Sequence, residues 1–127
     1  MSNKQKISPS LEDYLETILF LSQKNDIVRV TDVASEMNIS KPSVNKAVNI
    51  LKNQELVSHE HYGSLSLTEN GLEIATNVAR IHMVLKKFLK DLLNVEEETA
   101  EKEACLIEHR ISSDTIEKLS NYLNTVL

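Results

Sequence analysis

The chain has 127 residues, a length that fits one domain or a unit of two small lobes. A net charge of −5, a hydrophobic fraction of 41% and only two Gly and two Pro favour a helix-rich globular protein. The single Cys excludes an intramolecular disulfide, and no membrane-length apolar run or signal-peptide pattern is present, so we expect a cytoplasmic protein that does not enter a membrane.

Apolar residues recur at helical spacing in the first half of the chain, and two short alternating segments follow. Thr31 and Ser40 are the expected N-caps of two helices, and Pro42 suits a first turn. Gly63 separates the alternating segments and predicts a β-hairpin. The expected elements are a helix at 8–24, an extended segment at 26–30, helices at 31–38 and 41–54, and strands at 56–61 and 65–68. This order predicts a winged helix-turn-helix over residues 1–70.

The third predicted helix carries the features expected of a DNA-binding surface. Between Met37 and Gln54 the chain has three lysines and no acidic residue. The polar positions at or near the start of this helix are Ser40, Lys41, Pro42, Ser43, Asn45 and Lys46. Side chains of this kind reach phosphates and base edges in a major groove of DNA. We expect the hairpin tip, Tyr62 to Ser64, to lie along the DNA backbone beside that groove. The alternative is a helical bundle whose polar face is only solvated.

The second half of the chain predicts an all-helical domain over residues 71–127. A long helix at 68–93 precedes a loop and helix at 94–111, and Ser112 is the expected cap of a last helix. The expected inward positions of the long helix are Leu72, Ala75, Ala79, Ile81, His82, Leu85, Phe88 and Leu89, and those of the last helix are Ile116, Leu119, Leu123 and Val126. Apolar helices ending so small a chain favour a homodimer, with the last helix supplying the contact.

Cys105, Glu108 and His109 have the spacing i, i+3 and i+4, which places them on one face of a helix. A thiolate, a carboxylate and a neutral imidazole together suit a divalent first-row transition metal. The alternative is a half-buried Cys beside a solvated Glu–His pair.

Further donors lie on two other predicted helices. Asp13 and Glu16 are three residues apart on the first helix, and His82 lies on the long one. Each has a simpler explanation: Asp13 as the acid of a capping box begun by Ser10, Glu16 as a surface carboxylate, and His82 as a half-buried core residue. Metal binding is therefore predicted by the set of donors and by no single member.

Five segments resemble the family of the diphtheria toxin repressor and the manganese transport regulator. They are SLEDYLETILFL, VTDVASEMNISKPSVNKAVNILKNQELV, LSLTENGLEIA, RIHMVLKKFL and EACLIEHRIS, and they extend from about Ser10 to Tyr122. The resemblance implies a winged-helix lobe that binds operator DNA and a helical lobe that carries metal and the dimer interface. It also implies the short form of the family, which lacks an appended SH3-like domain.

Carried over by position, the resemblance implies the metal ligands Asp13, Glu16, His82, Cys105, Glu108 and His109, and a recognition helix that includes Ser40, Pro42, Ser43, Asn45 and Lys46. Two departures bear on the metal. Asp13 resembles the manganese branch, whereas Cys105 resembles the iron branch. Lys86 stands where a carboxylate is usual, which predicts at most one tight metal site per chain unless Glu101 completes a second.

These observations predict a homodimeric repressor of manganese or iron uptake genes that binds double-stranded operator DNA and uses Mn²⁺ or Fe²⁺. Without metal the acidic ligands repel one another, and a bound cation is expected to cancel that repulsion and link the DNA-binding lobe to the dimerising lobe. The main alternative is a winged-helix regulator that responds to an organic ligand or a protein partner. A zinc hydrolase using Glu108 as base is disfavoured because no HExxH spacing occurs, and a dimer that does not touch DNA is a further alternative.

Overall fold

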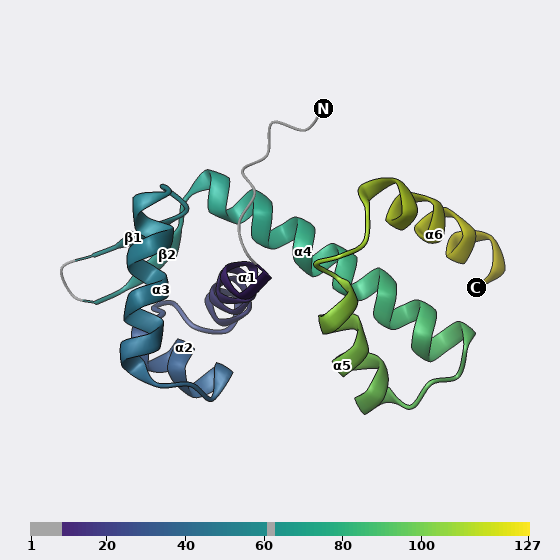
Figure 1. Ribbon diagram of the computed structural model, residues 1–127, viewed down its shortest axis with the longest axis horizontal. Helices are drawn as coiled ribbons and strands as arrows, with labels where there is room; N and C mark the ends of the chain where they lie inside the picture. The colour runs from purple at the N-terminus through teal and green to yellow at the C-terminus, as the bar shows by residue number, and fades with distance from the viewer. Residues whose placement is uncertain (1–8, 61–62) are drawn as a thin grey trace. The chain divides into compact units, whose positions relative to one another are not determined.

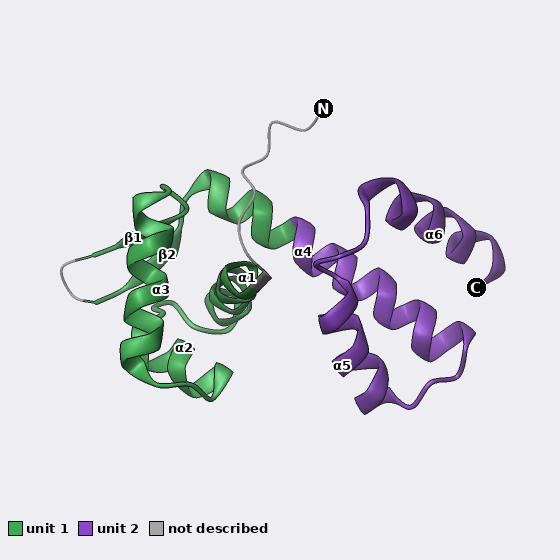
Figure 2. Cartoon of the chain, viewed as in Figure 1, with its two compact units in different colours: residues 1–76 green, residues 77–127 purple. Residues whose placement is uncertain are grey.

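A computed structural model describes residues 9–60 and 63–127 of the chain. In chain order its elements are α1 (Pro9–Lys24), α2 (Val30–Met37), α3 (Lys41–Asn53), β1 (Val57–His59), β2 (Leu65–Leu67), α4 (Glu69–Lys87), the π-helical turn η1 (Phe88–Leu92), α5 (Glu97–Ile107) and α6 (Ser113–Val126) (Figure 1). The chain divides into unit 1, Met1–Thr76, and unit 2, Asn77–Leu127, so α4 begins in one unit and continues in the other (Figure 2). Among the described residues, no helix has the length and apolar character needed to cross a membrane.

One hydrophobic core joins the three helices and the hairpin of unit 1. Leu15 and Ile18 of α1 are fully buried in it, together with apolar residues of every other element of the unit. The remaining buried members include Val33, Val44, Val48, Leu51, Leu56, Val57, Leu65 and Ala75. Burial of each large apolar side chain contributes about 1.5–3 kcal/mol, so these residues fix the positions of α2 and α3 against α1. The predicted winged helix-turn-helix arrangement is confirmed.

The start of α2 differs from the prediction. Arg29 is the residue before the helix, and its backbone N–H donates a hydrogen bond of 2.9 Å to Oδ2 of Asp32. Thr31 therefore lies inside the first turn, and its prediction as the N-cap is wrong. The acid at the third helical position supplied the stronger acceptor, as it does in capping boxes. Asn38 ends α2 in the left-handed region, with a φ of 57°, and so begins the turn to α3.

The hairpin that follows α3 pairs antiparallel, with Val57 opposite Leu67. The predicted extended segment adds to this sheet, because the N–H of Leu65 donates to the carbonyl of Val28 at 2.7 Å. Of the predicted hairpin tip, Tyr62 lies outside the described residues, and Gly63 has a φ of 79°, which a glycine adopts readily.

Thr68 connects the end of the hairpin to the start of α4. Its hydroxyl donates to the carbonyl of Glu55 at 2.7 Å and accepts the N–H of Gly71 at 3.1 Å. A Cβ on Gly71 would lie 1.9 Å from the carbonyl oxygen of Leu56, so the helix can approach the strand this closely only with glycine. The expectation that Leu72 points inward is wrong, since this side chain is 46% exposed beside that contact.

Unit 2 has its own smaller core. Ile81 and Leu85 of α4 pack with Ala104 of α5 and Ile116 of α6. The predicted long helix loses its α-helical repeat at Phe88, where the N–H of Leu93 bonds to the Phe88 carbonyl at 3.1 Å in the wider turn η1. Within the predicted loop and helix at 94–111, the helix α5 covers Glu97–Ile107.

The last helix buries two of the apolar residues that were expected on its inward side. Ile116 and Leu123 are only 1% and 2% exposed within the single chain. They therefore pack within unit 2, and Leu119 packs partly buried against the same core. The expectation that Val126 points inward is wrong, since it is 44% exposed. The contribution of the last helix to a dimer contact stays a prediction. The exposed apolar side chains of unit 2 are Met83, Leu93, Leu106, Ile107, Tyr122, Val126 and Leu127.

Candidate functional site

The residues predicted to contact DNA lie on the exposed side of α3. Lys41, Asn45 and Lys46 are exposed, while the apolar stripe that includes Val44 and Leu51 is buried in the core of unit 1. Because the core fixes the orientation of the helix, these polar side chains face solvent together. They form a surface able to meet the edge of a DNA groove.

The start of α3 is polar and free of acidic side chains. Oγ of Ser40 accepts the N–H of Ser43 at 3.3 Å, and its hydroxyl donates to Oγ of Ser43 at 2.9 Å, so the Ser40 side chain serves as the helix cap. Pro42 occupies the first turn, and no acid lies in that turn. The positive end of the helix dipole and the nearby lysines therefore act in the same direction and favour a phosphate.

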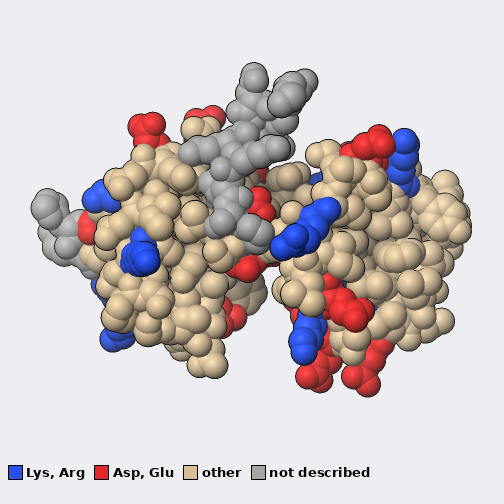
Figure 3. Space-filling view, viewed as in Figure 1, with Lys and Arg blue, Asp and Glu red and all other residues tan. Residues whose placement is uncertain are grey.

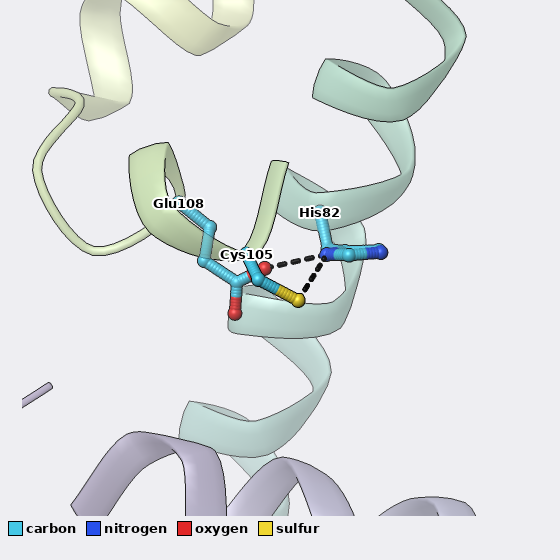
Figure 4. Close-up of side chains that lie close together, drawn as sticks. All are labelled: His82, Cys105 and Glu108. Atoms are coloured by element: carbon cyan, nitrogen blue, oxygen red, sulfur yellow. Dashed lines mark hydrogen bonds and ion pairs between the residues drawn. The ribbon is translucent and has the colours of Figure 1, made fainter. Parts of the chain in front are cut away.

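Three of the predicted metal ligands converge within unit 2. His82 on α4, Cys105 on α5 and Glu108 just after α5 each offer a donor atom, and these atoms lie within 4.8 Å of one another (Figure 4). Nδ1 of His82 lies 2.6 Å from Oε1 of Glu108 and 3.8 Å from Sγ of Cys105. A three-residue step from the last turn of α5 to the residue that follows it separates Cys105 from Glu108, so both lie on one side of this helix end, as their spacing predicted.

Glu108 is the most informative member of the cluster. It is 3% exposed, and its Oε2 is buried without a hydrogen-bond partner among the described residues. Nε2 of His109 lies 3.5 Å from that oxygen. A buried carboxylate oxygen needs a strong partner, because its desolvation is otherwise uncompensated. The thiolate, imidazole and carboxylate donors therefore fit a divalent cation of the first transition row in both chemistry and spacing.

The environment of His82 favours a positive charge at this place. Contacts with Cys105 and Glu108, opposed by burial and supported by Glu101, raise the pKa of His82 well above its usual value of 6.5. The protonated ring donates to both carboxylates, through Nδ1 to Glu108 and through Nε2 to Glu101 at 2.8 Å. A cation that binds the three donors must therefore displace a proton from Nδ1.

Glu101 is held between two cationic groups. Its Oε2 accepts from His82, and its Oε1 lies 3.1 Å from Nζ of Lys86. Burial raises the pKa of Glu101, but the hydrogen bonds from His82 and Lys86 outweigh it and lower that pKa below the usual value. Acidic and basic side chains lie next to one another on the face of unit 2 in Figure 3. The four-residue spacings of His82 to Lys86 and of Glu101 to Cys105 were the sequence signal for this contact.

The other predicted ligands are carried by α1 and by the turn that follows α5. Asp13 and Glu16 lie on α1 of unit 1, where both side chains are partly buried. His109 lies in the turn after α5 with its side chain 6% exposed, beside Glu108. Within unit 2 the structure thus gathers His82, Cys105 and Glu108 and places His109 at their edge.

Two family models together match almost the whole described chain. The N-terminal DNA-binding domain of the iron-dependent repressors matches residues 6–65, and their metal-binding and dimerisation domain matches residues 68–126. The chain belongs to the iron-dependent repressor family.

Known transcriptional regulators are similar to this chain over most of its length. An uncharacterised HTH-type transcriptional regulator of Methanocaldococcus jannaschii is 36% identical over 92% of this chain and 94% of its own length. The HTH-type transcriptional regulator MntR of Geobacillus kaustophilus is 33% identical over 90% of this chain and 80% of its own length. The solved structure of the manganese regulator SloR is 30% identical, with a TM-score of 0.82, and the match covers 93% of this chain and 55% of that one. The chain thus spans about half the length of that solved protein.

Proposed function

We propose that this iron-dependent-repressor family member is a metal-activated, DNA-binding repressor of manganese or iron uptake genes that acts as a homodimer. The observation that carries the proposal is the buried Glu108 carboxylate, which meets His82 and Cys105 in the unit that matches a metal-binding and dimerisation domain. The other unit matches a DNA-binding domain and exposes the polar side of α3. A regulator of this kind is not an enzyme. It works in the cytoplasm, and the free thiol of Cys105 is compatible with that reducing compartment.

In this proposal His82, Cys105 and Glu108 hold a divalent transition metal. When bound, the cation supplies two positive charges where the protonated imidazole supplies one. His82 gives up the proton on Nδ1, Cys105 gives up its thiol proton, and Glu108 keeps its buried oxygens directed at the cluster. Both Mn²⁺ and Fe²⁺ suit these donors, and the manganese regulators among the relatives favour Mn²⁺ as the first ion to test.

Asp13, Glu16 and His109 complete the ligand set that we propose from the sequence. Asp13 and Glu16 are carried by α1, whose Leu15 and Ile18 share a core with the buried side of α3. A shift of α1 caused by metal binding to its carboxylates would therefore also move the recognition helix α3, because the two helices share packed side chains. Metal then favours the DNA-competent arrangement because the ligands bind it better there, which is the thermodynamic requirement for activation.

The DNA-binding part of the proposal assigns Ser40, Lys41, Pro42, Ser43, Asn45 and Lys46 to the operator interface. Because Ser40 already caps α3, we assign it the role of fixing the helix start, while Lys41 and Lys46 meet phosphates. Two recognition helices in a symmetric dimer would read half-sites about 34 Å apart.

The test is a fluorescence-anisotropy titration against the promoter of the protein's own gene, with Mn²⁺, Fe²⁺ under anaerobic conditions, Zn²⁺ and chelator. We expect binding in the presence of Mn²⁺ or Fe²⁺ and its loss in chelator. Operator affinity that is equal with metal and with chelator would contradict the proposal and favour a regulator that senses an organic ligand. Sedimentation of the chelated protein should still show a dimer, whereas a monomer would mean that metal controls association.

A further inference from the structure

We propose that Glu101 and Lys86 are positioning residues that orient His82 for metal binding, with Glu101 fixing the ring and Lys86 fixing Glu101. The inference rests on the proposed metal site and adds two residues that do not themselves bind the ion. The three side chains form a chain of contacts from α4 to α5 and back to α4.

The two nitrogens of His82 face different groups. Nδ1 faces the donors of Cys105 and Glu108, while Nε2 lies 2.8 Å from Oε2 of Glu101. A neutral imidazole has one nitrogen that accepts and one that donates. If Nδ1 binds metal, Nε2 must carry the ring proton. Oε2 of Glu101 then accepts a hydrogen bond from this N–H. Carboxylates placed in this way hold a histidine ligand in one tautomer and one ring orientation.

Lys86 restricts Glu101 in turn. Its Nζ lies 3.1 Å from Oε1 of Glu101, while Oε2 faces Nε2 of His82 and lies 3.8 Å from Sγ of Cys105. Both oxygens of the carboxylate are therefore held. Exposed fractions of 33% for Lys86 and 48% for Glu101 leave the pair partly screened, so its main effect is on side-chain orientation. The ammonium also places a fixed positive charge beside the Nε2 edge of His82. A second metal ion on that edge would meet like charge, a protonated nitrogen and a carboxylate that already contacts His82, Lys86 and Cys105.

A neighbouring ion pair provides a matched control. Lys90 and Glu97 join η1 to α5 one turn away from Lys86 and Glu101, and they form the same kind of ion pair. Lys90 is four residues after Lys86, and Glu97 is four residues before Glu101. A variant of Glu97 therefore tests for a general loss of contact between these elements without touching His82.

The experiment measures metal binding by the 127-residue chain, using calorimetry with Mn²⁺ and absorption with Co²⁺, in which a thiolate-to-metal band reports Cys105. Glu101→Ala should weaken binding about 10–100-fold, with an unchanged number of ions per chain and the thiolate band retained. Glu101→Gln should recover most of that loss, because its amide oxygen still accepts from Nε2. Lys86→Arg should bind metal like the wild type, Lys86→Ala more weakly, and Glu97→Ala like the wild type.

Three outcomes would overturn the inference. Wild-type affinity in Glu101→Ala would show that His82 needs no positioning. A reduced number of ions in both Glu101→Ala and Glu101→Gln would make Glu101 a direct ligand. An equal loss of metal affinity in Glu97→Ala would show that the effect comes from weaker packing of α5 against its neighbours and not from the position of His82. A wild-type protein that binds neither Mn²⁺ nor Co²⁺ would instead overturn the proposed function itself.

Discussion

Replacing Lys46 with alanine tests the assignment of α3 to the DNA interface quantitatively. Lys46 is exposed on the polar side of α3, and a dimer brings two copies of it to one operator. Each lost phosphate contact reduces the slope of log affinity against log salt by about 0.9, so the dimer should lose about 1.8. Affinities converge near 1 M salt, so binding should weaken about 30-fold at ~0.15 M and about 200-fold at ~0.05 M salt.

The assay is the metal-loaded anisotropy titration repeated over a series of salt concentrations, with calorimetry to check that Lys46→Ala binds Mn²⁺ normally. Lys52→Ala is the matched control, since Lys52 is an exposed lysine in the last turn of the same helix and should leave the slope unchanged. An unchanged slope in Lys46→Ala, or an equal decrease in both variants, would refute the assignment of Lys46 to a phosphate.

The remaining predictions concern the metal cluster and the packing of unit 1. Glu108→Gln should abolish metal-dependent operator binding while circular dichroism stays native; retained metal response would make the cluster incidental. Cys105→Glu should keep the Mn²⁺ response and lose relative preference for Zn²⁺ and Co²⁺ in competition calorimetry, since a hard carboxylate replaces a soft thiolate. The raised pKa of His82 means that its protonated form stabilises the metal-free fold fully below pH 6.5, and that this contribution declines as the pH rises toward the folded pKa. Mn²⁺ affinity should therefore rise with pH, and a flat profile in calorimetry would contradict proton displacement. Gly71→Ala should lower the Tm, because steric overlap costing about 1–3 kcal/mol opposes a helix-propensity gain of about 1 kcal/mol. Asn70→Ala is its control, and a higher Tm for Gly71→Ala would show that the Leu56 carbonyl can move.

Local patterns were sufficient to predict most of the fold. The apolar spacing along α3 predicted that Val44 and Leu51 face the core, and both are buried. The errors lie where two groups compete for one role. Asp32, not Thr31, satisfies the backbone at the start of α2, and Gly71, not Leu72, faces Leu56 at the start of α4. Helix propensity and the spacing of apolar residues do not show which of two neighbouring residues takes such a role.

The sequence was sufficient to predict which residues form the candidate site, but not which contacts their side chains make. Residue type and spacing selected Cys105, Glu108 and His82, and the structure brings their donor atoms together. The spacing could not show that α5 ends just before Glu108, which leaves that carboxylate buried, or that Glu101 contacts both His82 and Lys86. These features depend on how α4 packs against α5, which is tertiary information. The roles of Asp13, Glu16 and His109 as ligands stay predictions.

The hydrogen bond from Thr68 to the Glu55 carbonyl joins two positions 13 apart in the sequence and closes a loop that contains the whole hairpin. Closing a loop this short costs little chain entropy, and doubling its length would add only about 0.6 kcal/mol. The described contacts at the base of the hairpin join Thr68, Gly71 and Leu56. Residues added between the strands would therefore leave this closure in place and change its entropic cost only with the logarithm of the loop length.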